Sequence, residues 1–186
     1  MVPFLNSRVS AVPIVWFEDY SAGAERAIGF SNNTRNTLPA GPLSVFGTDG
    51  FLGEAMLASL KPGARQFAQI GDEPDTELAA GSPVRSLVAK HVDFAGGELR
   101  LHSIHSVTRS VRFNNQSGRE RDVYLGLDVV LNATVVGSER VDYETATRRP
   151  LAVFRVPAGQ GAERKLVTHE AIQVGTRTAS LSVEQL

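Results

Sequence analysis

Hydrophobic and polar residues alternate along much of the chain, which is the pattern of strands with one buried face. The longest example covers 99–113, where Leu99, Leu101, Val107 and Phe113 share one parity. Shorter apolar or alternating runs occur at 12–17, 25–30, 43–46, 121–130, 151–156 and 164–174. Asn, Gly and Pro residues separate these runs and mark turns. The pattern predicts an all-β protein, an immunoglobulin-like antiparallel β-sandwich.

Two segments fit a helix as well as a strand. In 51–60, Leu52, Ala55 and Met56 have helical spacing, yet alternate positions are apolar as well. Segment 82–91 opens with Ser-Pro, which suits the first turn of a helix. Because predicted strands surround both segments, we expect β-structure in each.

A short motif occurs twice and suggests an internal repeat. Phe30 is followed by Ser-Asn-Asn-Thr, and Phe113 is followed by Asn-Asn-Gln-Ser. In each half a Pro-containing turn and a further strand come later in the sequence. We therefore predict two sandwich-like halves, 1–80 and 90–186, joined by a linker at about 80–89. Phe30 and Phe113 are predicted to be equivalent core residues.

The run 12–17 is apolar on both faces if it is a strand. Val12, Ile14 and Trp16 lie on one side, and Val15 and Phe17 lie on the other. A strand of a two-layer sandwich usually meets water on one face, so this strand predicts a surface that needs a partner. The candidate interaction residues are Val12, Ile14, Trp16, Phe17 and Tyr20. Either the rest of the chain folds over this surface, or a second copy of the chain or another protein covers it. We expect self-association through this strand or through an edge of the sandwich.

Composition excludes several classes of protein. The chain has 186 residues, with 19 basic and 20 acidic side chains and no cysteine. Near-neutral charge argues against a nucleic-acid-binding protein, and the lack of thiols excludes disulfide scaffolds and cysteine-ligated metal centres. The sequence has no apolar stretch long enough for a membrane span, and its first residues do not form a typical secretory signal.

No pattern of reactive side chains indicates catalysis. His102 and His105 are three residues apart, so a strand would point them to opposite faces, and we expect no metal site and no cofactor. We also expect folding to need no divalent metal. The acidic run 72–77 lacks the spacing of a calcium-binding loop, and no Gly-x-Ser-x-Gly sequence is present. The sequence therefore predicts that the protein is not an enzyme.

Several segments resemble one family. They read Thr-Arg-Asn-Thr-Leu-Pro-Ala-Gly-Pro-Leu-Ser-Val-Phe at 34–46, Gly-Phe-Leu-Gly-Glu-Ala at 50–55 and Leu-Lys-Pro-Gly at 60–63. Together with similar stretches in most of 24–175, they resemble the C-terminal β-rich domain of mucoidy-inhibitor-A-like bacterial proteins. That domain has no established function and no established catalytic residues. The resemblance implies a structural role associated with the cell envelope; the sequence otherwise fits the cytoplasm.

These observations predict a non-catalytic structural or protein-interaction module that self-associates. An alternative is a module that binds carbohydrate or an envelope polymer through exposed aromatic rings. Its available aromatic residues are Trp16, Tyr20, Tyr124 and Tyr143. A hydrolase that uses two carboxylates ranks last, because nothing in the sequence singles out a pair.

Overall fold

The computed structural model describes residues 9–48, 50–144 and 147–177, and these residues contain strands, turns and a few loops but no helix. The strands are β1 (Ser10–Phe17), β2 (Glu25–Ser31), β3 (Gly41–Gly47), β4 (Gly50–Leu57), β5 (Arg65–Asp72), β6 (Thr76–Ala80), β7 (Val84–Ala95), β8 (Glu98–Asn115), β9 (Arg121–Gly126), β10 (Thr134–Val136), β11 (Arg140–Tyr143), β12 (Pro150–Val156) and β13 (Gln160–Arg177). The predicted all-β class is confirmed, and both ambiguous segments supply strands, β4 and β7. The start of the chain, examined above for a secretory signal, lies outside the described residues.

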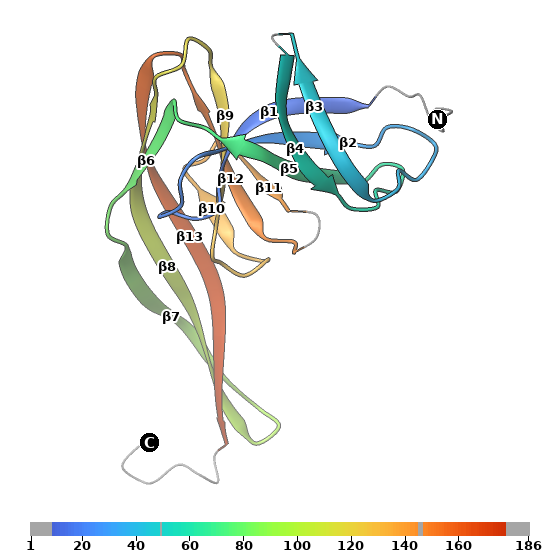
Figure 1. Ribbon diagram of the computed structural model, residues 1–186. Helices are drawn as coiled ribbons and strands as arrows, with labels where there is room; N and C mark the ends of the chain where they lie inside the picture. The colour runs from blue at the N-terminus through green and yellow to red at the C-terminus, as the bar shows by residue number, and fades with distance from the viewer. Residues whose placement is uncertain (1–8, 49, 145–146, 178–186) are drawn as a thin grey trace.

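The strands form three sheets, which Figure 1 shows from one side. A six-stranded sheet has the order β11-β12-β9-β1-β2-β5. A five-stranded sheet has the order β10-β13-β8-β6, with β7 also paired to β8, and β3 and β4 form a separate hairpin. All pairings between described strands are antiparallel except that of β1 with β9, which is parallel.

The main core lies between the six-stranded and five-stranded sheets. Phe17, Phe113 and Phe154 form its aromatic centre, with Phe113 ring centroids 4.8 Å from Phe154 and 6.2 Å from Phe17. A second core joins β2 and β5 to the β3–β4 hairpin and contains Phe30, Leu60 and Ile70. The six-stranded sheet is therefore covered in one part by the five-stranded sheet and in another by the β3–β4 hairpin, which makes the fold a sandwich of packed layers.

The repeated Phe-x-Asn motif has the same structure in both copies. Asn32 and Asn115 are completely buried, and each side-chain oxygen accepts hydrogen bonds from the backbone N–H and the hydroxyl of the residue two positions later. Each side-chain nitrogen donates to the carbonyl four residues later and to a distant carbonyl, that of Leu60 or of Val156. Phe30 and Phe113 are both buried, as predicted.

The predicted division of the chain needs correction. Residues 84–89, expected in a linker, belong to β7, which pairs with β8 along its length. The halves also share sheets, because β1 pairs with β9 and β6 pairs with β8. Backbone N–H and C=O groups at the edge of each half find partners in the other half, so the halves fold as parts of common sheets.

A narrow three-stranded projection extends away from the layered body. We call it the arm and define it as residues 84–108 and 167–177, that is β7 with the paired stretches of β8 and β13. Figure 1 shows it continuing beyond the remaining strands. Its β7–β8 hairpin closes through Gly96 and Gly97, whose φ angles of 61° and 78° suit a two-residue hairpin turn.

Candidate functional site

The predicted interaction strand is mostly buried by the chain itself, which corrects that expectation. Ile14, Trp16 and Phe17 are buried, whereas Val12 is 49% exposed and Tyr20 is partly buried. Phe17 lies in the main core. Trp16 lies on the opposite face of the same sheet, where the Phe67 ring packs 5.4 Å from it. Ala27 and Gly29 on the intervening strand β2 are small, so the Phe67 ring can extend across β2 and cover Trp16. No second copy of the chain is needed to cover this face.

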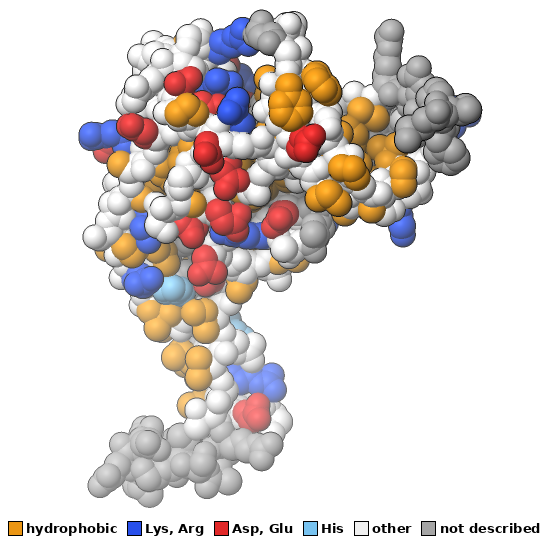
Figure 2. All heavy atoms as spheres, viewed as in Figure 1, with side chains coloured by type: hydrophobic (Ala, Val, Ile, Leu, Met, Phe, Trp, Pro, Cys, Tyr) orange, Lys and Arg blue, Asp and Glu red, His pale blue; other side chains and the backbone are white. Residues whose placement is uncertain are grey.

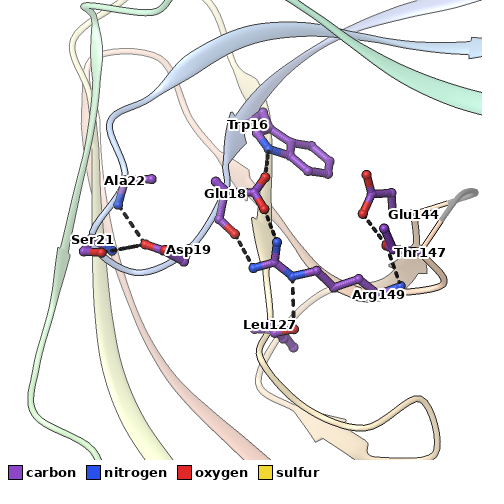
Figure 3. Close-up of polar contacts among 9 residues, drawn as sticks. All are labelled: Trp16, Glu18, Asp19, Ser21, Ala22, Leu127, Glu144, Thr147 and Arg149. Atoms are coloured by element: carbon purple, nitrogen blue, oxygen red, sulfur yellow. Dashed lines mark hydrogen bonds and ion pairs between the residues drawn. The ribbon is translucent and has the colours of Figure 1, made fainter.

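Polar contacts fix the end of this strand, as Figure 3 shows. The Trp16 indole Nε1 donates to Glu18 at 3.1 Å, and Glu18 also forms an ion pair with Arg149. The Arg149 guanidinium donates in addition to the backbone carbonyls of Glu18 and Leu127. These bonds tie the end of β1 to the residue that precedes β12 and to the loop that follows β9.

The aromatic residues considered for carbohydrate binding do not form one platform. Trp16 and Tyr124 are buried beside Phe67. The Tyr20 ring is covered by the Arg109 guanidinium, 4.2 Å from the ring centroid. Tyr143 is 38% exposed. The strip of accessible rings that the alternative required is therefore absent from these four residues.

A cavity of about 700 Å³ lies where the sandwich meets the arm. It is lined by charged side chains from both parts: Arg85, Arg109, Arg149, Asp19, Asp128 and Glu170. His105 also lines it, with Nδ1 3.6 Å from a Glu170 oxygen. The cavity brings together several carboxylates, the residue type that the hydrolase alternative would require.

Several charged groups in this cavity have partners within the chain. The Asp19 carboxylate accepts hydrogen bonds from the Ser21 hydroxyl, the Ser21 N–H and the Ala22 N–H. The Ser21 hydroxyl, followed by the Ser21 N–H, lowers the pKa of Asp19, so this carboxyl is ionised at neutral pH and cannot serve as a proton donor. Glu170 accepts the Val130 N–H at 3.1 Å. The Glu170 contact joins the loop that contains Val130 to the base of the arm.

The arm carries a second surface feature, an uncovered apolar face. Pairing across β7, β8 and β13 places three rows of side chains on one side of the arm. The rows are Phe94–Leu99–Thr176, Val92–Leu101–Val174 and Ala89–Ser103–Ile172. Val92 is 56% exposed, Phe94 63% and Val174 57%. None of the nine residues is charged, and we call them the apolar face.

The apolar face continues the side of β8 that faces the core. Val111 and Phe113 point from β8 into the sandwich and are completely buried. Val107 and Arg109, on the same parity, line the charged cavity, and Leu101 and Leu99 lie further along the arm. Hydrophobic side chains are visible on the arm and on the β3–β4 hairpin in Figure 2. The strand thus passes from a covered to an uncovered apolar side as it leaves the body.

The expectation that the histidines are wrongly placed to share a site is wrong for one pair. His102 and His105 do point to opposite sides, but His91 lies directly opposite His102 in the β7–β8 hairpin. Their rings stack with centroids 4.2 Å apart, and Asp93 is close by. The sequence reasoning compared only histidines on one strand and so missed a cross-strand pair.

No family model, no curated protein and no solved structure matches the chain in the comparisons made. No described residue belongs to a helix of the length and apolarity that a membrane span requires.

Proposed function

We propose that the chain is a non-catalytic interaction module that self-associates through the apolar face of its arm. The observation that carries the proposal is this contiguous, exposed and uncharged face of the arm. Val92, Phe94 and Val174 on this face are each more than half exposed. Contiguous exposed apolar surface of this kind is typical of protein-interaction sites, so the face favours a protein partner.

A second copy of the chain fits this surface best. An interface with twofold symmetry presents the same patch from both copies, so any charge on the patch would face a like charge near the axis. The apolar face has none among its nine residues. Two arms can therefore stack face to face without electrostatic repulsion, and each covers the other's Val92, Phe94 and Leu101.

The resemblance to the β-rich domain of mucoidy-inhibitor-A-like bacterial proteins is part of this proposal. That resemblance favours a structural role at the bacterial cell envelope, where self-association would build or tether a larger assembly. The Glu170 contact in the charged cavity favours the same interpretation, because this carboxylate accepts the Val130 N–H and so links the arm to the sandwich.

The test compares two exposed valines of the same strand. Val92 lies on the apolar face, whereas Val88, which is 49% exposed, pairs with Ile104 on the opposite side of the arm. Light scattering at micromolar concentration should give the wild type about twice the chain mass of 20.0 kDa. Val92→Asp should give the monomer mass, and Val88→Asp should remain dimeric.

Two results would overturn self-association through this face. One is a wild type that stays monomeric, including the case in which it instead binds lipid vesicles or an unrelated protein. The other is a Val92→Asp variant that remains dimeric while its circular dichroism matches that of the wild type.

A further inference from the structure

Three side chains that metals use as ligands converge near the end of the arm. His91 and Asp93 are two residues apart on β7 and therefore share a face, and His102 on β8 is the direct partner of His91. One nitrogen or oxygen from each residue lies within 4.8 Å of the others. The His102 Nε2 is 2.6 Å from Asp93 Oδ2. The cluster lies on the side of the arm opposite the apolar face.

The hairpin turn sets this arrangement. With a two-residue turn at Gly96 and Gly97, the pairing counts outward as 95 with 98, 93 with 100 and 91 with 102. Lys90 then forms a bulge, and beyond it Ala89 pairs with Ser103. Had the register of the outer part of the hairpin, where Ala89 pairs with Ser103, extended inward through this point, Lys90 would oppose His102 and place an ammonium there. The bulge leaves an imidazole in that position.

The second carboxylate oxygen of Asp93 has no hydrogen-bond partner in the part of the chain that the structure describes. Asp93 Oδ1 is inaccessible to solvent and accepts no hydrogen bond from the described residues, although Oδ2 of the same group contacts His102. A buried carboxylate oxygen without a donor is costly. A cation bound between Asp93 and the two imidazoles would satisfy it.

We propose that His91, Asp93 and His102 bind one divalent transition-metal ion, with Zn²⁺ as the best-fitting ion. Two imidazole nitrogens and one carboxylate oxygen form a donor set that suits zinc and copper, whereas Mg²⁺ and Ca²⁺ need more oxygen ligands. Water completes the coordination. Binding replaces the His102–Asp93 hydrogen bond, and the proton of that bond passes to the solvent.

The required movement is small. Ligand atoms of a tetrahedral zinc ion lie about 3.3 Å apart, given Zn–N distances of about 2.0–2.1 Å. The His102 and Asp93 atoms are already closer than this, and His91 is exposed, so its ring can rotate out of the stack toward them. The bound ion would connect β7 to β8 and hold the end of the arm together.

The experiment titrates the full chain, without a polyhistidine tag, with ZnCl₂ and separately with MgCl₂ by calorimetry. We expect one Zn²⁺ per chain, no Mg²⁺ binding, and affinity at least about tenfold weaker in His91→Ala and in His102→Ala. His169→Ala is the matched control, because His169 also lies on the arm but its Nδ1 is 2.7 Å from the Ser106 hydroxyl. That variant should bind zinc as the wild type does.

A second measurement needs no variant and is therefore independent of their folding. In the NMR spectrum of the wild type, Zn²⁺ should shift the ring signals of His91 and His102 and leave those of His105 and His169 in place. The proposal is overturned if no zinc binds, if the His91→Ala affinity is unchanged, or if the other two histidines shift instead. Because the apolar face lies on the other side of the arm, Val92→Asp should bind zinc normally whether or not the chain dimerises.

Discussion

The buried Asn115 side chain joins the turn after β8 to the end of β12, and its removal should cost several kcal/mol. Its nitrogen donates to the carbonyls of Arg119, Val156 and Pro157, and its oxygen accepts the N–H and the hydroxyl of Ser117. The side chain therefore closes the turn after β8 and attaches it to the end of β12. It is completely buried.

The magnitude follows from the groups that lose their partners in Asn115→Ala. Each buried polar group left without a hydrogen bond costs about 1–3 kcal/mol. Two such groups, the Ser117 N–H and the Val156 carbonyl, give a loss of about 2–6 kcal/mol in the free energy of unfolding. At about 2–4 °C per kcal/mol for a chain of this size, the melting temperature should fall by about 10 °C.

The assay is urea denaturation followed by circular dichroism, with the neighbouring Asn114→Ala as control. Asn114 is exposed, so its replacement should change the free energy of unfolding by less than about 0.5 kcal/mol. Asn115→Asp is a further comparison, because it keeps an accepting oxygen but turns a second oxygen toward three carbonyls. It should be at least as destabilising as Asn115→Ala at neutral pH. A loss below about 1 kcal/mol in Asn115→Ala would refute the reasoning, since water would then have replaced the side chain.

Three further outcomes follow from the contacts. Phe113→Ala, which removes the ring between Phe17 and Phe154, should lower the free energy of unfolding by about 3–5 kcal/mol in denaturant titrations. Ser21→Ala removes the main donor that lowers the pKa of Asp19, so NMR titration should find that pKa closer to its ordinary value of 3.8. In the wild type, the stabilisation that comes from the lowered pKa is present above pH 3.8 and is lost as the pH falls through the folded-state pKa. Burial raises the pKa of Tyr20 and the Arg109 cation opposes this, so Arg109→Met should raise it further in a spectrophotometric titration.

The sequence was sufficient for the features that depend on local pattern. Alternation over 99–113 predicted the strand that became β8, and the two Phe-x-Asn motifs predicted turns that share one hydrogen-bonding scheme. Surrounding strands correctly decided the two ambiguous segments. In β4, Gly53 has a φ of 153° and passes so close to Ile70 that a Cβ would lie 1.9 Å from the Ile70 carbonyl oxygen. This close approach occurs where Gly53 is part of a strand, and the spacing of apolar residues in the sequence does not reveal it.

The features that were missed depend on which distant strands pair. The parallel pairing of β1 with β9 joins the two predicted halves, and no local sequence pattern predicts it. The apolar strand 12–17 was expected to need an external partner, but Phe67, from a strand on the far side of β2, covers Trp16. The His91–His102 pair is different, because counting outward from the Gly96–Gly97 turn gives it directly from the sequence. That count was the available signal.

A single strand explains why the candidate sites lie where they do. The side of β8 that faces the sandwich holds Phe113 where the six-stranded sheet covers it and Arg109 where that cover gives way to a cavity. Further along the arm the same side holds Leu101, with no described layer over it. The side chains change from a packed core to a charged junction and then to an apolar face, although strand geometry is continuous. An apolar side that stays exposed lowers solubility unless something covers it, so a strand that regains apolar residues after the charged junction points to a partner at the arm.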